Sequence, residues 1–216
     1  SGCGADQSDT SNNSSDRQID ENTKPESASP VISAHDLNKE DSDAIEAISG
    51  YTYYRKPDYP NSVNLPLQFI TLSSGKKLSV RVTLPADKNG NPIAGSFPTI
   101  VTQSAYNTNL LSYIFNGVPG NLLLGVSDAF IVTRGYAQVA VDTLGTGASQ
   151  GKWELIGEAE QVGFAEAIDW AQSQPWSNGD IGVAGVSYMA ISSLIAAQRR
   201  PDAVKAVFAS LPMGDA

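Results

Sequence analysis

The chain has 216 residues, of which 41% are apolar, and this length allows one well-buried domain but leaves little for a second. Its net charge of −9 is concentrated near the start: residues 1–50 carry eleven acidic and three basic side chains, whereas residues 51–216 carry twelve and eleven. Because the body is nearly neutral and has no basic stripe, the composition argues against nucleic acid as a partner.

Residues 1–50 contain no aromatic side chain and are dominated by small polar and acidic residues. Such a stretch cannot bury enough apolar surface to offset the entropy of ordering it. We therefore predict a disordered leader over residues 1–50 and a folded domain over residues 51–216. A short amphipathic helix over residues 36–48 is the one exception that the pattern allows.

The chain's single cysteine, Cys3, offers neither an internal disulfide nor a cysteine-based metal cluster. The small residues before Cys3 and the polar stretch after it resemble the processing site of bacterial lipoproteins, whose mature chain begins at a lipid-modified cysteine. This resemblance implies lipidation of Cys3, tethering to a membrane and a secreted, cell-envelope location. A surface thiol in a disordered end is the alternative. No segment approaches the roughly 18 apolar residues needed to span a bilayer.

The apolar patterns after residue 66 predict an antiparallel start to a sheet. Residues 67–72 and 77–84 predict two strands of a hairpin, because the residues between them have the usual composition of a turn. Residues 99–102 and 136–141 are short, unbroken apolar runs, which are typical of strands covered on both faces. Loops are expected up to residue 66 and over residues 85–98, and an irregular segment that contains residues 116–120 is expected between the strands at 99–102 and 136–141.

The second half of the body predicts helices that alternate with strands. Residues 159–173 place Val162, Ala165, Ile168 and Ala171 on one stripe, as in a helix that packs on a sheet. A strand, a helix and a further strand are then expected over residues 181–186, 188–199 and 204–209. This order, after an antiparallel start, indicates an α/β fold with a mostly parallel sheet.

The strand over residues 181–186 runs directly into the following helix through the turn Gly185-Val-Ser-Tyr188. A serine at such a sharp strand-to-helix corner takes a strained backbone conformation and points its hydroxyl out of the sheet, which is how hydrolases present a nucleophile. Ser187 is therefore a candidate nucleophile. The pattern G-x-S-x-G is incomplete, because Met189 stands in place of its second glycine, so an ordinary structural turn is the alternative on these residues alone.

Four blocks of sequence, in this order, resemble the α/β-hydrolase family that contains Xaa-Pro dipeptidyl-peptidases, cocaine esterase, glutaryl acylases and α-amino-acid ester hydrolases. The blocks lie at residues 100–106, 134–151, 169–179 and 185–188, and the resemblance spans about residues 65–212. It implies an α/β-hydrolase fold, of which this chain is the amino-terminal part. It also implies a serine hydrolase that cleaves an ester or amide bond through an acyl-enzyme.

The resemblance assigns roles to three residues. Ser187 would be the nucleophile, and the backbone N–H of Tyr188 would form half of the oxyanion hole. Tyr106 would supply the other half with its phenol, although without the resemblance an aromatic side chain that packs the core at a strand end is the simpler interpretation. The family's elbow has the form G-x-S-Y-x-G, so that Ala190 departs from its final glycine, and Leu144 departs from a usual arginine.

A nucleophilic serine also needs a base to remove its proton and a carboxylate to orient that base. The only histidine, His35, lies in the acidic leader before the fold, whereas the hydrolase order is serine, then acid, then histidine. His35 is therefore interpreted as a solvated linker residue. We expect the aspartate and histidine of the triad to lie outside this chain, and we expect the chain alone to have little or no hydrolytic activity.

Two other interpretations stay open on the sequence. The first is a catalytically inactive lipoprotein with a hydrolase-like fold that acts as a binding or scaffold module. The second is a nucleotide-binding loop at residues 145–151, which its spacing G-x-G-x-x-x-G and the lack of a helix directly after it disfavour. For the hydrolase we expect a small ester or amide, or a short peptide, as substrate, with no metal or organic cofactor. Peptidase, esterase and β-lactam acylase activities are all compatible with the sequence.

Overall fold

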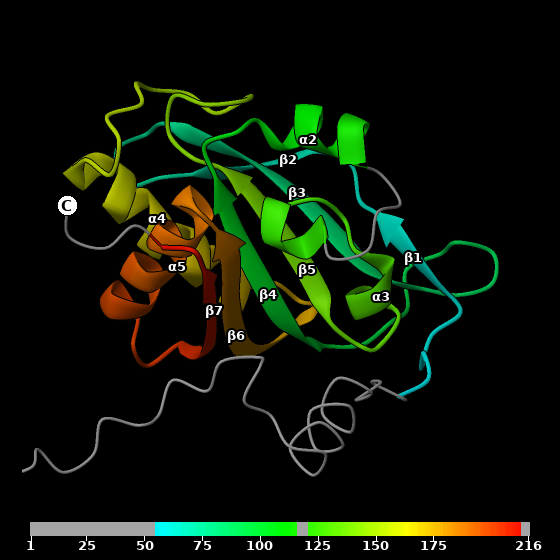
Figure 1. Cartoon of the computed structure of the whole chain (residues 1–216). Helices are drawn as coiled ribbons and strands as arrows, with labels where there is room; N and C mark the ends of the chain where they lie inside the picture. Colours follow the sequence, from blue (N-terminus) through cyan, green and yellow to red (C-terminus); the bar gives the residue numbers. More distant parts are fainter. Residues whose placement is uncertain (1–54, 116–120, 213–216) are drawn as a thin grey trace, which may run out of the picture. The chain divides into compact units, whose positions relative to one another are not determined.

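The structure is a computed structural model, and it describes residues 55–115 and 121–212 (Figure 1). The predictions for the leader, including those on Cys3, His35 and the helix over residues 36–48, lie outside the described residues. Residues 116–120, part of the segment expected to be irregular, lie outside them as well. Within the described ranges, no helix has both the length and the apolar character that crossing a membrane requires.

A single sheet of seven strands runs through the described part of the chain (Figure 1). Its order is β1-β3-β5-β4-β6-β7, and β2 pairs with β3 next to β1. The strands are β1 (Asn61–Asn64), β2 (Gln68–Thr71), β3 (Lys77–Ala86), β4 (Phe97–Ser104), β5 (Ala137–Asp142), β6 (Ser177–Val186) and β7 (Val204–Ser210).

The pairing directions confirm the predicted α/β sheet with an antiparallel start. β2 and β3 form the expected hairpin, whose turn is closed by the Leu72 N–H donating to the Lys76 carbonyl at 2.8 Å. β3 is antiparallel to β5, whereas β4 runs parallel to both β5 and β6, and β6 runs parallel to β7. The carboxyl ends of β4, β5 and β6 therefore meet at one edge of the sheet, where ligand sites of open α/β sheets usually form.

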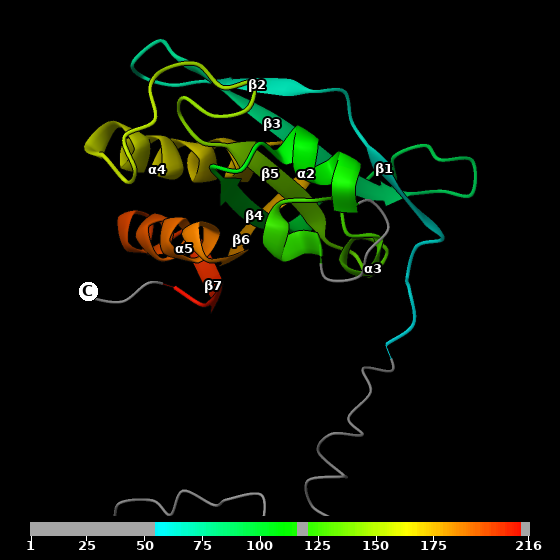
Figure 2. The same cartoon turned by 45° about the horizontal axis from the view of Figure 1, so that its top comes forward.

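The helices are α2 (Thr108–Phe115), the 3-10 helix η1 (Asn121–Leu124), α3 (Ala129–Val132), α4 (Glu158–Gln172) and α5 (Tyr188–Arg199). The contacts of two neighbouring residues of β4 show that helices cover both faces of the sheet. The Gln103 side chain donates to the Phe164 carbonyl of α4, whereas the Thr102 hydroxyl donates to the Leu122 carbonyl of η1. Because successive strand residues point to opposite faces, α4 and η1 lie on opposite sides. Figure 2 shows α4 and α5 side by side.

The core consists of aliphatic side chains on the central strands and of the inner faces of α4 and α5. Val82, Val101, Val139 and Ile181 are fully buried, and each contributes about 1.5–3 kcal/mol relative to an exposed position. The predicted stripe on α4 is confirmed at its buried alanines and isoleucine, whereas Val162 is half-buried. Unbroken apolar runs thus became central strands because both of their faces are covered.

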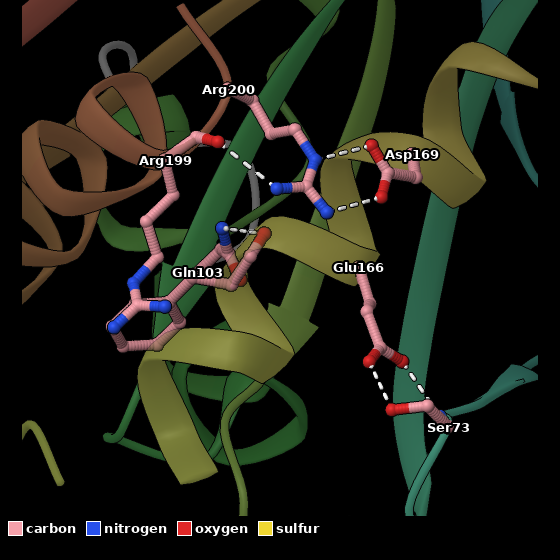
Figure 3. A network of polar contacts seen from close by, with 7 residues as sticks. Ser73, Gln103, Glu166, Asp169, Arg199 and Arg200 are labelled. Carbon is pink, nitrogen blue, oxygen red and sulfur yellow. Dashed lines mark hydrogen bonds and ion pairs between the residues drawn. The ribbon is translucent and has the colours of Figure 1, made fainter. Parts of the chain in front are cut away.

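Polar contacts fasten α4 and α5 to each other and α4 to the hairpin (Figure 3). Arg200, at the end of α5, donates to both carboxylate oxygens of Asp169 at 2.6 Å. On α4, the Glu166 carboxylate accepts from the Ser73 N–H at 2.8 Å. These contacts fix α5, and with it the turn that precedes α5, against the rest of the fold.

The structure differs from the predicted elements at the ends of several strands and between β4 and β5, and residues 97–98, expected in a loop, begin β4. Residues 61–64 and 85–86, expected in loops, belong to β1 and β3; Pro85 is tolerated there because the pairing of β3 with β5 ends at Thr83, so no ladder hydrogen bond to β5 needs the missing N–H. The segment between β4 and β5, expected to be irregular, contains α2, η1 and α3. α3 begins with an N-cap in which the Asp128 side chain accepts from the Phe130 N–H.

Candidate functional site

Ser187 lies between the end of β6 and the start of α5, where the sequence predicted it. Its backbone has φ 55° and ψ −122°, a combination that residues with a side chain rarely adopt. Its N–H donates to the Ser210 carbonyl at the end of β7 at 3.0 Å, and its carbonyl accepts from the Ala190 N–H at 2.9 Å. Ser187 is nevertheless exposed, so the strained turn presents an accessible hydroxyl.

The residues beside the serine explain why the turn is possible. A Cβ on Gly185 would lie 2.4 Å from both the Cβ and the carbonyl carbon of Met189, so this position accepts only glycine. Ala190 is fully buried in the first turn of α5, so its methyl group, the departure from the family's final glycine, is packed inside the core. The sequence therefore forms the elbow with one obligatory glycine.

Tyr106 follows the end of β4, and its phenol lies beside the candidate nucleophile. The Tyr106 hydroxyl donates to Ser187 Oγ at 3.3 Å, and the side chain is 44% exposed. Its backbone is held from both sides, because the Tyr106 N–H donates to Ser104 Oγ at 3.0 Å and the Thr108 N–H donates to the buried Asp142 carboxylate at 2.7 Å. The structure thus brings together two residues that are 81 positions apart in the sequence.

Tyr188 is the first residue of α5, and its backbone N–H and its side chain have different roles. Its N–H belongs to the first turn of the helix, where no intrahelical acceptor is available. Its side chain is buried, and the ring packs edge-on against Tyr106 and Trp153 at centroid distances of 6.1 and 6.3 Å. The buried ring anchors the peptide unit that follows Ser187.

A residue that the sequence analysis missed, Glu160, holds the phenol of Tyr188. The Tyr188 hydroxyl donates to Glu160 Oε1, and the second oxygen, Oε2, accepts from the Ile156 N–H at 2.8 Å. Glu160 is 2% exposed, and this burial raises the pKa of its carboxyl above the ordinary value of 4.5. An acidic residue in the first turn of a helix is typical of a solvated helix start, so the sequence carried no signal for this buried position.

The glycine-rich loop at residues 145–151 packs against the protein itself. A Cβ on Gly147 would lie 2.1 Å from Asp142 Oδ2, and one on Gly145 would lie 2.1 Å from the Trp153 backbone nitrogen. These glycines are therefore explained by close internal contacts, and α4 begins only at Glu158. The arrangement lacks the helix start that a dinucleotide loop requires.

The described residues bring Ser187, Tyr106 and Tyr188 together, but they contain no imidazole, because the chain's one histidine is His35. The Tyr106 hydroxyl lies beside the Ser187 hydroxyl in space, and the Tyr188 N–H belongs to the next residue in the sequence. Both groups are hydrogen-bond donors. Donors arranged in this way can stabilise the negative charge that develops on a carbonyl oxygen under nucleophilic attack. The chemistry that fits this arrangement is acyl transfer.

Comparisons with known proteins identify a hydrolase family and fold. The model of a family described as X-Pro dipeptidyl-peptidase (S15 family) matches residues 74–216. A comparison with curated proteins found no match. Among solved structures, a CocE/NonD family hydrolase from Staphylococcus aureus is similar at 26% identity with a TM-score of 0.54, over 67% of this chain and 26% of its own length.

Two further solved structures are similar in fold. An α-amino acid ester hydrolase matches 78% of this chain and 28% of its own at 22% identity and a TM-score of 0.58. An aminopeptidase from a marine sediment archaeon (Thaumarchaeota archaeon) matches 76% of this chain and 28% of its own at 22% identity and a TM-score of 0.54. The fold is therefore that of an α/β hydrolase, and this chain spans 26–28% of the length of these three relatives.

Proposed function

Because this chain belongs to the X-Pro dipeptidyl-peptidase (S15) family, we propose that it carries the nucleophile of a hydrolase that cleaves an ester or amide bond. The observation that carries the proposal is the 3.3 Å contact between the Tyr106 hydroxyl and Ser187 Oγ at a strained, exposed elbow. A structural turn gives no reason for an exposed serine with a rarely adopted backbone conformation.

In the proposed reaction, Ser187 Oγ attacks the substrate carbonyl carbon and forms an acyl-enzyme. The Tyr106 hydroxyl and the Tyr188 N–H donate to the carbonyl oxygen as it becomes negatively charged, the leaving alcohol or amine takes a proton, and water then releases the acid. The proton of Ser187 requires a base. The described residues contain no histidine, so we assign that role, and the carboxylate that orients it, to a part of the protein other than the described fold.

We propose small esters or amides and short peptides as the substrate class. The names of the similar proteins include a dipeptidyl-peptidase family, an aminopeptidase and an α-amino acid ester hydrolase. Tyr106 contacts the Ser187 hydroxyl, and Trp153 packs against the ring of Tyr188; both side chains are partly exposed and offer apolar surface to a small acyl group. These features support the class of bond that is cleaved, and they are compatible with peptidase, esterase and acylase activity.

A catalytically inactive binding module is the second candidate function. One observation favours it, namely that the only histidine of the chain precedes the fold. In such a protein Ser187 would lack a base and would be no more reactive than an ordinary serine hydroxyl. The elbow and Tyr106 would then be structural features of the fold.

Labelling with a fluorophosphonate probe, followed by peptide mapping, distinguishes the two candidates. The probe is applied to the natural protein isolated from its host, because an active-site serine is labelled only where a base activates it. The hydrolase proposal expects modification of the peptide that contains Ser187 and no labelling of a Ser187→Ala variant. Ser173→Ala is the matched control, because Ser173 is exposed like Ser187, and this variant should be labelled as the parent is. Ser192 is unsuitable because its hydroxyl is buried. Absence of labelling at Ser187 would favour the binding module.

We also propose that Cys3 is lipidated and tethers the protein to the bacterial cell envelope. The support is the sequence Ser-Gly-Cys-Gly at residues 1–4, followed by a long polar stretch before the fold. The intact mass of the natural protein tests this proposal. We expect added acyl mass on the peptide that contains Cys3, and we expect Cys3→Ser to lose both this mass and membrane association. A soluble protein with an unmodified Cys3 would contradict it.

A further inference from the structure

A polar recess lies on the face of the sheet that carries α2, away from the candidate nucleophile. It has a volume of about 270 Å³ and is lined by β1, β3, α2 and the segment before α3, through residues that include Asn64, Arg81, Asn109, Ser112, Tyr113 and Ser127. In the sheet, β5 and β4 separate β3 from β6, which leads to Ser187. Neither Ser187 nor Tyr106 lines the recess, and nothing in the proposed hydrolase chemistry uses it.

The hydrogen bonds of Asn109 determine which of its atoms is left for a ligand. An Arg81 side-chain nitrogen donates to Asn109 Oδ1. A guanidinium can only donate, so the atom that faces it must be the amide oxygen. The Asn109 amide nitrogen, a donor, is the group that is left without a bond among the described residues.

Asn64 shows the same pattern on the opposite wall. Its Oδ1 accepts from the Thr83 hydroxyl at 2.7 Å and from the Ser127 hydroxyl at 2.6 Å. The Asn64 acceptor is therefore used twice by the protein itself, and its amide nitrogen is again left as a donor. Both asparagines are exposed, and each offers an amide nitrogen to the recess beside an oxygen that already accepts from the protein.

Ser112 adds a hydroxyl that has no partner. Its Oγ is buried and, within the described residues, makes no hydrogen bond. A buried polar atom without a partner destabilises a protein by about 1–3 kcal/mol, so a ligand that reached this hydroxyl from the recess would satisfy it.

Arg81 supplies a positive charge that the surrounding residues do not neutralise. No carboxylate lies within ion-pair distance of Arg81 in the described ranges, and the recess lining contains no acidic residue. By contrast, Arg199 and Arg200 pair with Glu158 and Asp169 at 2.6 Å. A half-buried guanidinium without a carboxylate, in a recess that offers donors, favours an anion.

We propose that this recess binds the carboxylate of a small organic acid. A carboxylate has only acceptors, which matches the two amide nitrogens, the Ser112 hydroxyl and the remaining guanidinium N–H groups. The volume lies just below the range of about 300–1,000 Å³ typical of small-molecule pockets, which fits a compact acid and not a folded partner. The inference rests on these contacts alone and stands whether or not Ser187 is a nucleophile.

Isothermal titration calorimetry of the full chain with succinate tests the proposal, with the uncharged succinamide and inorganic phosphate as comparison ligands. We expect saturable binding of succinate at one site and no binding of succinamide. Arg81→Gln should weaken succinate binding by about tenfold or more, because it removes a charge-assisted hydrogen bond. Lys88→Gln removes the same charge from an exposed position outside the recess, and it should change the affinity less than about twofold.

Ser112→Ala is the second test variant, because Ser112 Oγ has no internal bond to lose among the described residues. It should weaken succinate binding by about three- to tenfold while leaving the urea unfolding midpoint at or above that of the parent. Unchanged affinity in both Arg81→Gln and Ser112→Ala, equal binding of succinamide, or the absence of saturable binding would each overturn the proposal. Tighter binding of phosphate than of succinate would overturn the assignment to a carboxylate.

Discussion

Tyr188, the residue directly after the candidate nucleophile, hydrogen-bonds through its phenol to the buried carboxyl of Glu160. The same carboxyl accepts from the Ile156 N–H, so that Glu160 connects the elbow with the loop that precedes α4. In addition, the Thr143 hydroxyl at the end of β5 lies 3.4 Å from the Tyr188 phenol. One acidic side chain therefore helps to position the backbone N–H that we propose for the oxyanion hole.

We expect the burial of Glu160 to make stability depend on pH. Because burial raises the pKa of Glu160 above 4.5, the folded state binds the proton more tightly than the unfolded state. Its stabilising contribution is fully present below about pH 4.5 and is lost as pH rises through the folded pKa. Glu160→Gln cannot ionise, so its free energy of unfolding should fall less between pH 5 and pH 7.5 than that of the parent. Urea unfolding at several pH values measures this.

The matched control for this pH dependence is Glu158→Gln, which removes an exposed carboxylate from the same helix. It should keep the slope of the parent protein. Asp87 also has a shifted pKa, but its pKa is lowered from 3.8 by hydrogen bonds from Asn91, so its contribution changes only below this pH range. Equal slopes in the parent and in Glu160→Gln would show that Glu160 is ionised in both states.

Tyr106→Phe should separate catalysis from folding in the complete enzyme. The substitution removes the phenol that contacts Ser187 Oγ but keeps the ring, so we expect kcat to fall by about a hundred- to a thousandfold with little change in KM. Steady-state kinetics on a chromogenic ester measures both constants. Tyr59→Phe, which also loses a phenol but packs against Phe97 away from the elbow, should keep the parent kcat. A parent-like kcat in Tyr106→Phe would remove Tyr106 from the oxyanion hole.

The local parts of this site could be predicted from the sequence, whereas the parts assembled from distant segments could not. β6, the elbow and α5 follow one another directly, so the apolar pattern and Gly185 sufficed to place Ser187. Tyr106 entered only through a family resemblance, because no periodicity shows that the end of β4 lies beside the end of β6. Glu160 was missed because acidic residues are almost always solvated, and only the packing of Tyr188 shows why this one is buried.

Gly185→Ala should be strongly destabilising, because the new Cβ would lie 2.4 Å from the backbone and Cβ of Met189. Backbone atoms at the start of α5 cannot move aside without shifting the helix, so we expect a loss of about 3 kcal/mol or more in the free energy of unfolding. Gly182→Ala in the same strand is the control, since its Cβ would have only ordinary contacts at 3.9 Å or more. Urea unfolding of both variants measures the difference, and similar midpoints would contradict the close contact at the elbow.

Ser187→Gly should be more stable than Ser187→Ala, although both remove the candidate nucleophile. At φ 55° and ψ −122° the backbone of residue 187 lies in a region that glycine adopts readily and that a Cβ disfavours by roughly 1–3 kcal/mol. Glycine also raises the conformational entropy of the unfolded chain, which destabilises the folded state by about 0.5–1 kcal/mol relative to alanine and offsets part of the gain. We therefore expect a net gain of about 1 kcal/mol for Ser187→Gly over Ser187→Ala in urea unfolding at a fixed pH. If Ser187→Ala were the more stable variant, the elbow would hold no strain, and the proposal would lose the backbone feature that distinguishes a nucleophile turn from an ordinary one.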